Sequence, residues 1–407
     1  MDTSNRDPST REPLSDDAVA EARQRVCDRV DELADVLVAT SHAIHAEPEL
    51  CFEEHVAHEL LTGVLADEGL SVERGAYGLA TAFEADAGSE GPMVAVLCEY
   101  DALPGIGHAC GHNVIATAGL GAGLAAAAVA GKLGGRVRIL GTPAEEGGGG
   151  KVVMANRGAF EGVDAAMMIH PADADLENIT SLAIQQARVV YEGRAAHAAA
   201  APEKGLNALD AMVLGYVNVA ALRQHIAPDE RLHGIFLESG DKANIVPRRT
   251  VASWYARSPS RAGLETLKTR LVACLEAGAT GAGCGIQIEW IQPGYAEVVD
   301  NRTLLDRYVA NAAQLGRDVQ PTITHQVVGS TDMGNVSYLV PGIHPMIKVA
   351  PRGTAIHTEE FARYAVSAEA DQAVIDGAKV MALTIVDCWS DPAVLDAART
   401  EFAGIGT

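Results

Sequence analysis

The segment EYDALPGIGHACGHN, residues 99 to 113, places two carboxylates, a cysteine and two histidines among glycine and proline. Burying such side chains without partners costs several kcal/mol each, so packing alone rarely gathers them. Divalent ions such as Zn and Mn accept imidazole, carboxylate and thiolate together, and catalytic sites leave one position open for water. Cys110 and His112, spaced C-x-H in a glycine turn, therefore predict part of a metal site.

Three further segments carry residues of the same kinds. Glu145 and Glu146 in the segment TPAEEGGGG directly precede four glycines. These glycines predict that the backbone approaches another group closely. His170 precedes a proline, and His357 in TAIHTEEF precedes a predicted helix. Each also has an ordinary alternative, such as a solvated acidic loop or a lone surface histidine. Their shared position after predicted strands or in turns favours one common site.

The elements that position these residues are predicted by hydrophobic patterning. Residues 93–100, 135–143 and 163–171 form apolar strands that alternate with helical segments, which is typical of a mostly parallel α/β sheet. Ligands of such sheets bind beyond the carboxyl ends of the strands. Glu99 and Asp101 follow the first strand, and the carboxylate pair and His170 follow the other two, so we expect these side chains to converge.

A chain of 407 residues exceeds what one core usually organises, so two domains are expected. From residue 184 the order becomes strand, helix, two strands, helix and strand, an α+β unit of its own. We predict a tail over 1–18, a catalytic domain over 19–183 and 299–407 with helices on both faces of a mixed, mostly parallel sheet, and a smaller inserted domain over 184–298.

The composition narrows the class of protein. The net charge of −23 argues against nucleic acid and membrane surfaces as partners. The polar N-terminus has no apolar signal-peptide core, and the Ala/Gly-rich stretch 114–131 is interpreted as a buried core helix. Seven sparsely spread cysteines, an odd number, are typical of reduced thiols, so we expect a cytoplasmic protein.

Five motifs in this order, YDALPGIGHACGHN, PAEEGGGG, IHP, GRAAHAAAAPEKGLNALDA and HTEEF, make the chain resemble the M20 family of metallopeptidases and amidohydrolases over about residues 20 to 390. The resemblance is to the branch of aminoacylases, aminobenzoyl-glutamate hydrolases, hippurate and auxin-conjugate hydrolases and related dipeptidases. It implies a two-metal catalytic domain and an inserted lid domain that forms a homodimer.

The resemblance also implies roles for individual residues. Glu145 would be the general base, and Asp101 would orient a metal ligand. Glu99 stands where other branches have a metal-binding histidine, which leaves the filling of both metal positions open. The implied ligands of the metals are Cys110, His112, Glu146, His170 and His357.

The predicted lid domain carries two further residues of this kind. His197 matches a histidine that reaches into the partner subunit's site and stabilises the oxyanion, and Asn244 matches a residue that contacts substrate. Arg248, its neighbour Arg249, or Arg352 could anchor a substrate carboxylate, although an ordinary surface role is the alternative for each. The loop Ser330–Asp332 is expected near the site without an assigned role.

The predicted reaction is hydrolysis of the amide bond of an N-acyl amino acid, a dipeptide or a related small amide, by a metal-bound water with Glu145 as base. We expect one or two divalent ions per subunit, Zn or Mn, with Co and Ni also tolerated. Two alternatives remain open: a hydrolytic deaminase of a small aromatic or heterocyclic amine, and a non-catalytic metal- or ligand-binding module.

Overall fold

A computed structural model describes residues 14–322 and 328–405 and divides the chain into two compact units. The first unit comprises the described residues up to Thr180 and from Val298 onward, and the second unit is Ser181–Glu297. The predicted tail over 1–18 is too long at its C-terminal end, because helix α1 begins at Asp16, where the Ser15 side chain accepts a hydrogen bond from Ala18 N. The first thirteen residues of that tail lie outside the described residues.

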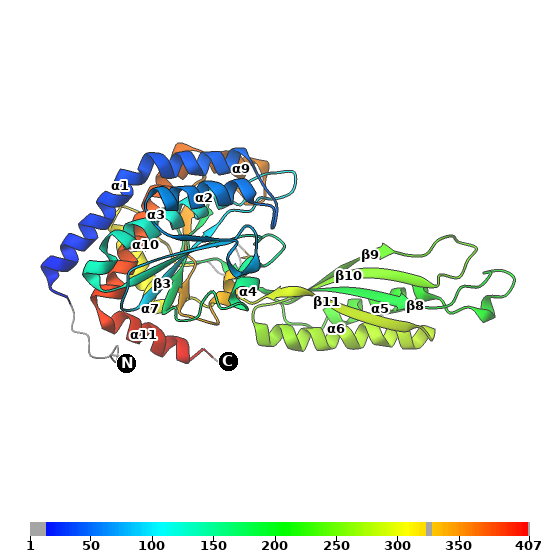
Figure 1. Ribbon diagram of the computed structural model, residues 1–407. Coiled ribbons are helices and arrows are strands. Elements are labelled where there is room, and N and C mark those ends of the chain that lie inside the picture. The colour runs from blue at the N-terminus through cyan, green and yellow to red at the C-terminus, as the bar shows by residue number, and fades with distance from the viewer. Residues whose placement is uncertain (1–13, 323–327, 406–407) are drawn as a thin grey trace, which may run out of the picture. The chain divides into compact units, whose positions relative to one another are not determined.

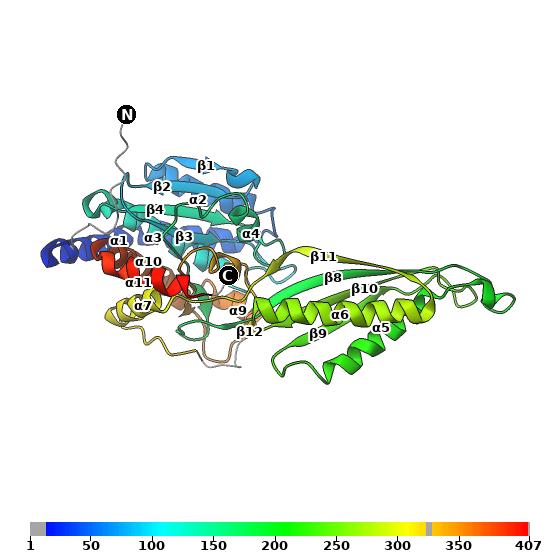
Figure 2. The same ribbon diagram turned by 90° about the horizontal axis from the view of Figure 1, so that it is seen from below.

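The first unit is built on a six-stranded mixed sheet in the order β1-β2-β4-β3-β5-β13 (Figures 1 and 2). The pairs β3–β4, β3–β5 and β5–β13 are parallel, and β1–β2 and β2–β4 are antiparallel. The strands are β1 (Val72–Arg74), β2 (Phe83–Ala87), β3 (Met93–Glu99), β4 (Arg136–Thr142), β5 (Ala165–Met167) and β13 (Gly342–Ile343). The predicted α/β class with a mostly parallel sheet is confirmed.

Helices cover both faces of this sheet, as alternate residues along β3 show. Val94, Val96 and Cys98 belong to one apolar core, and Met93 and Leu97 belong to another. The first core includes residues of α1 (Asp16–Ala46), α2 (His55–Asp67), α3 (His112–Leu133), α7 (Arg302–Gln314), α9 (Glu359–Tyr364), α10 (Ala368–Ser390) and α11 (Pro392–Ala403). The second includes residues of α4 (Gly150–Ala155) and α8 (Met333–Val336).

Helix α3 is the central helix of the first core. Among the described residues it alone is long and apolar enough to cross a membrane by length and composition, and 83% of its most apolar window is buried inside the protein. Gly119 and Gly123 let it approach the sheet closely, because a Cβ there would lie within 3 Å of β3 backbone and of the Ile139 side chain. The burial agrees with the predicted core helix.

The predicted strand over 163–171 is wrong as a single element. β5 ends at Met167, and a separate strand β6 (His170–Ala172) pairs in parallel with β14 (Met346–Lys348) in a two-stranded sheet. His170 therefore begins a short strand instead of ending a long one. Short elements complete this unit: η2 (Ala76–Gly78), β7 (Thr180–Ser181), whose second residue belongs to the second unit, and β12 (Val328–Gly329).

The second unit has the predicted order of elements. Its antiparallel sheet, β11-β8-β10-β9, carries α5 and α6 on one face, where Val189, Trp254 and Leu271 share a core (Figure 1). The elements are β8 (Ala183–Glu192), η3 (Pro202–Lys204), α5 (Ala208–Arg223), β9 (Arg231–Glu238), β10 (Arg249–Ser258), α6 (Arg261–Ala282) and β11 (Gly285–Tyr295).

Candidate metal centre

The carboxyl ends of β3 and β4 lie at one edge of the first unit's sheet because the strands are parallel. β3 ends at Glu99, and the turn after β4 carries Glu145 and Glu146. The nearby start of α3 contributes His112. This edge is where the sequence predicts the site.

The five predicted metal ligands form two groups that share Cys110. One consists of Cys110, His112 and His170, and the other of Cys110, Glu146 and His357, with the ligand atoms of each group within 4.8 Å of one another. Cys110 Sγ lies 3.3 Å from His170 Nε2, and His357 Nε2 lies 3.3 Å from Glu146 Oε1. A thiolate shared by two such groups can bridge two ions.

Hydrogen bonds orient the imidazoles of the first group. His170 Nδ1 donates to the carbonyl of Pro171 at 2.8 Å, so the proton is on Nδ1 and the Nε2 lone pair faces Cys110. His112 Nδ1 lies 3.2 Å from Asp101 Oδ1, and Asp101 Oδ2 accepts from Glu146 N at 2.9 Å. Asp101 thus contacts both a histidine and the loop of a carboxylate, as partners of metal ligands do.

The donor set fits a divalent cation. Glu99 Oε1, His112 Nε2 and Glu146 Oε1 are buried and make no hydrogen bond. Such buried acceptor atoms are costly unless a proton or cation lies among them. The mixture of thiolate, imidazole and carboxylate suits Zn and other first-row metals better than Mg or Ca.

The pKa values of the two adjacent carboxyl groups in the turn after β4 are shifted in opposite directions. Burial, together with Glu99 and other nearby carboxylates, raises the pKa of Glu145 well above its ordinary value. Burial also acts to raise the pKa of Glu146, but the neighbouring imidazoles of His357 and His112 bring this pKa below its ordinary value. Glu146 is therefore suited to be a permanent anion, and Glu145 is suited to accept a proton.

The glycine run after this pair makes the predicted close backbone contacts. A Cβ on Gly150 would lie 1.8 Å from the carbonyl oxygen of Pro143, and one on Gly148 would lie 2.4 Å from the Phe52 ring. Gly149 adopts a left-handed conformation with φ of 61°. These residues hold the turn that presents the two glutamates.

A buried ion network beside the centre was missed by the sequence analysis. The Lys151 ammonium contacts Glu99 Oε2 and lies 2.7 Å from Asp332 Oδ1, with all three side chains at most 1% exposed. Asp332 belongs to the loop Ser330–Asp332 that was expected near the site. Lys151 had no local signal, since a lysine after a glycine run is ordinarily exposed.

His344 was also missed. Its buried ring lies against that of His170, with centroids 5.5 Å apart and planes at 80°, and neither of its nitrogens has a hydrogen-bond partner. Burial lowers the pKa of His344 well below its ordinary value, so the ring is neutral.

The residues predicted to contact substrate lie on both units. His197 and Asn244 are neighbours on the second unit, where Ala198 N donates to Asn244 O at 3.0 Å. His197 Nδ1 accepts from the amides of residues 199 and 200, so Nε2 carries the proton and is a donor. Arg248 is exposed on the second unit, and Arg352 is exposed on the first.

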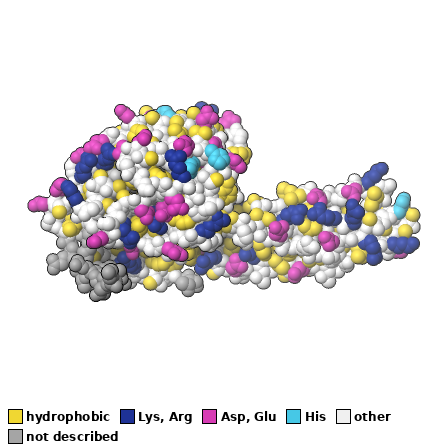
Figure 3. Space-filling view, viewed as in Figure 1, with side chains coloured by type: hydrophobic (Ala, Val, Ile, Leu, Met, Phe, Trp, Pro, Cys, Tyr) yellow, Lys and Arg dark blue, Asp and Glu magenta, His cyan; other side chains and the backbone are white. Residues whose placement is uncertain are grey.

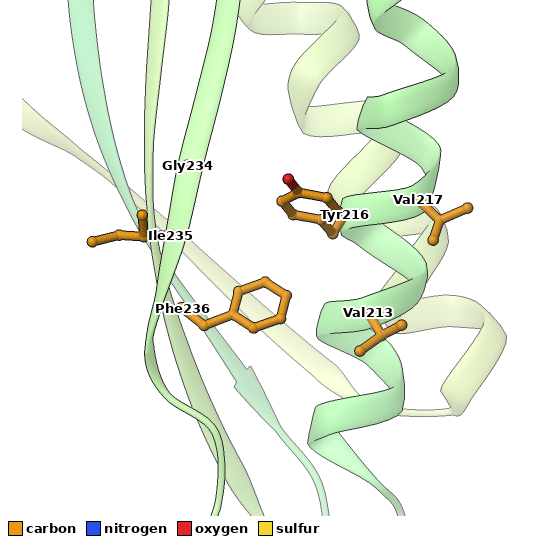
Figure 4. A pocket seen from close by; sticks show the side chains of 6 residues that line it. All are labelled: Val213, Tyr216, Val217, Gly234, Ile235 and Phe236. Atoms are coloured by element: carbon orange, nitrogen blue, oxygen red, sulfur yellow. The ribbon is translucent and has the colours of Figure 1, made fainter.

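The second unit also has an apolar surface at the edge of its sheet. The edge strand β9 exposes Ile235 (63%) and Leu237 (54%), and α5 exposes Val217 (56%). Between them lies an open pocket in which Phe236 and Tyr216 face each other (Figure 4). Unpaired edge strands with apolar side chains are ready to pair with another chain.

Charge is divided unequally between the units. Residues 181–297 contain twelve Lys and Arg against eleven Asp and Glu, which gives them a net charge of +1. Because the whole chain has a net charge of −23, the remaining residues carry −24. In Figure 3, acidic and basic side chains are mixed over the first unit, and Lys and Arg side chains with some acidic ones follow the second. The metal centre therefore lies in the acidic unit.

Comparison with known proteins agrees with this fold and donor set. The family model described as peptidase family M20/M25/M40 matches residues 95–387. An Xaa-Arg dipeptidase of Mus musculus is 40% identical over 93% of this chain and 92% of its own. A p-aminobenzoyl-glutamate hydrolase chain of Escherichia coli is 28% identical over 95% of this chain and 93% of its own.

A solved structure shares the fold. The YXEP protein of Bacillus subtilis, described as a dinuclear metal binding peptidase from the M20 family, matches with a TM-score of 0.69 and 19% identity over 88% of this chain and 99% of its own.

Fold, donor set and comparisons together define a metal-dependent hydrolase that acts on the amide bonds of dipeptides or acyl amino acids. The chain belongs to peptidase family M20/M25/M40.

Proposed function

We propose that this protein is a dipeptidase that prefers a basic C-terminal residue, in which Cys110, His112, Glu146, His170 and His357 would hold divalent ions and Glu145 acts as general base. The observation that carries the proposal is the pair of donor groups sharing Cys110, with Glu145 in a third group beside Glu99 and His112. Zn and Mn are the ions this donor set favours, and Co and Ni are tolerated.

The bound metals would polarise the scissile carbonyl and lower the pKa of water toward neutrality. Glu145 takes a proton from the attacking water and delivers it to the departing amine, so one amide and one water become a carboxylic acid and an amine. Burial and the neighbouring Glu99 raise the pKa of Glu145, which favours uptake of a proton by its carboxylate. His112 and His170 stay oriented through Asp101 and the Pro171 carbonyl.

The preference for a basic residue has two supports. The mouse relative is named for cleaving dipeptides that end in arginine. The residues outside 181–297 carry a net charge of −24, whose field attracts cationic substrates and raises their rate of encounter. N-acyl amino acids and neutral dipeptides are expected to be poorer substrates, and Arg248 and Arg352 remain candidates for the substrate's carboxylate.

We further propose a homodimer formed through β9 and α5 of the second unit. A second copy is favoured as the occupant because an edge strand with consecutive exposed apolar side chains can pair with its own symmetry mate. In this dimer, His197 Nε2–H stabilises the oxyanion of the partner subunit's site. We also propose that the protein acts in the cytoplasm.

The test is hydrolysis of four dipeptides that differ only in the C-terminal residue, Ala-Arg, Ala-Lys, Ala-Leu and Ala-Glu, together with N-acetyl-Arg and an aryl amide. We expect faster cleavage of Ala-Arg and Ala-Lys, loss on chelation, recovery with Zn or Mn, and loss in Glu145→Gln with metal content retained. Equal rates for Ala-Arg and Ala-Glu would contradict the basic preference. Ammonia release from an aromatic amine, without amide cleavage, would instead identify a deaminase. Inactivity of the metal-loaded protein on all amides would contradict the hydrolase.

A further inference from the structure

Lys151 connects two carboxylates behind the metal centre. Its ammonium contacts Glu99 Oε2 and Asp332 Oδ1, and its backbone amide donates to Asp332 Oδ2 at 2.9 Å. Both oxygens of Asp332 are therefore occupied, but only one oxygen of Glu99 is.

The remaining oxygen, Glu99 Oε1, faces His112. The Oε1 and Nε2 atoms are 3.0 Å apart, both are buried, and neither makes a hydrogen bond. Because His112 Nδ1 is directed at Asp101, the Nε2 atom presents its lone pair. Two facing lone pairs at this distance repel each other unless a proton or a metal cation lies between them, and a metal cation can also bind the other donors of the centre.

The separation suits two ligands of one ion. Metal bonds of about 2.1 Å at right angles place adjacent ligand atoms about 3 Å apart. Glu99, His112 and Glu145 also form one of the three donor groups whose atoms lie within 4.8 Å of one another.

We propose that Glu99 supplies Oε1 as a further ligand to the cation held by His112, and that Lys151 and Asp332 are positioning residues that fix this carboxylate. The inference rests on the metal centre of the proposed function and extends it beyond the five predicted ligands. Because Lys151 occupies Oε2, the carboxylate binds through one oxygen only, which leaves room for water on the metal.

Charge supports this arrangement. The ammonium of Lys151 and the carboxylates of Glu99 and Asp332 are each at most 1% exposed, so the three groups are buried as partners of one another. The ammonium contacts Oε2 and so leaves Oε1 directed toward His112.

Glu99→Gln tests the ligand directly. The amide oxygen must face the Lys151 ammonium, so the NH₂ group replaces Oε1 in front of His112 and cannot bind a cation. We expect one of the two Zn or Mn ions to bind at least tenfold more weakly by isothermal titration calorimetry, and its loss on dialysis against a chelator, measured by elemental analysis. The other ion should bind as in the wild type.

Lys151→Met and Asp332→Asn should weaken the same ion, because Glu99 loses its fixed orientation. Lys379→Met is the matched control, since it removes a largely buried lysine paired with Asp31 at 2.6 Å between α10 and α1. It should leave both affinities unchanged. If Lys151→Met does not fold, the nearly isosteric Glu99→Gln and Asp332→Asn carry the test.

The inference would be overturned if Glu99→Gln bound two ions, each with the affinity measured for the wild type. The outcome is separable from that of the proposed function. If the wild type binds two ions but cleaves no amide, only the proposed function is contradicted. If the enzyme is active but its metal affinities are the same in Glu99→Gln, only the role of Glu99 as a ligand is contradicted.

Discussion

The Glu54 carboxylate accepts a hydrogen bond from Ala144 N at 2.9 Å, across ninety positions of sequence. The same oxygen accepts from Phe52 N at 2.8 Å, and the other accepts from the Thr81 hydroxyl at 2.8 Å. Ala144 and Phe52 both have left-handed backbone, with φ of 62° and 64°. One buried carboxyl therefore holds two strained residues, of which Ala144 directly precedes Glu145.

Glu54→Gln should change how stability depends on pH. Burial raises the pKa of Glu54 from 4.5 to about 7, so the folded protein binds more protons than the unfolded chain between these values. The contribution of Glu54 to the free energy of unfolding is complete below about pH 4.5 and is lost as the pH rises through 7. Gln stays neutral: its oxygen can accept from the amides of Phe52 and Ala144, and its NH₂ group can donate to the Thr81 hydroxyl oxygen instead of accepting from it. The variant's free energy of unfolding should rise relative to wild type by up to about 3 kcal/mol between pH 4.5 and 8.5. The prediction is contradicted if urea titrations give the same difference in unfolding free energy between variant and wild type at pH 4.5 and at pH 8.5.

The regular secondary structure could be predicted from the hydrophobic pattern of the sequence. Buried strands read as apolar runs, so β3 and β4 were predicted nearly to the residue, and the residues after them were predicted as the site. Residues 163–171 were misread because one apolar run continues across Met168 and Ile169, where the chain passes from one sheet to another.

The supporting residues could not be predicted because their partners are distant in sequence. Lys151 is satisfied by carboxylates 52 and 181 positions away, and Glu54 by an amide 90 positions away. A local pattern cannot distinguish such groups from solvated surface charges. The metal donors were recognisable only because several motifs occurred together.

Gly150→Ala should disrupt the metal centre. The new Cβ would lie 1.8 Å from the Pro143 carbonyl oxygen, so the backbone that carries Glu145 and Glu146 must move. We expect a loss of about 1–3 kcal/mol in unfolding free energy and weaker cation binding. Gly131→Ala is the control, because nothing lies within 4 Å of its Cβ in helix α3. It should gain about 0.5–1 kcal/mol and bind cations normally. Equal thermal stability and affinity in the two variants would refute this explanation of the glycine run.

Asp101→Asn should weaken cation binding with little loss of fold. Asp101 Oδ1 lies against His112 Nδ1, and Oδ2 accepts from Glu146 N. An amide can satisfy only one of these donors, so either the imidazole or the Glu146 loop loses its orientation. Calorimetric titration with Zn or Mn should show about 10–100-fold lower affinity. An unchanged affinity would mean that Asp101 is not needed to orient the ligands.

Ile235→Glu should separate the proposed dimer. Ile235 is 63% exposed on the edge strand β9, so a charge there is tolerated in a single chain but is buried without a partner in a dimer. Sedimentation should give a monomer, and its circular dichroism spectrum should be that of the folded wild type. Arg257→Glu, also a charge change on this unit's sheet but on β10, should remain dimeric. A wild-type monomer, or a dimeric Ile235→Glu, would exclude this interface.

Mixing two inactive variants should show whether His197 acts on the partner subunit. His197→Ala and Glu145→Gln are each expected to lose most activity. If His197 acts across the dimer, a mixed dimer has one complete site, formed by Glu145 of the His197→Ala chain and His197 of the Glu145→Gln chain. Random exchange makes half of the dimers mixed, so about a quarter of the wild-type rate should return. If His197 serves its own subunit, both sites of a mixed dimer are defective and no activity returns. The Glu145→Gln, Ile235→Glu double variant should fail to restore activity because it cannot exchange subunits.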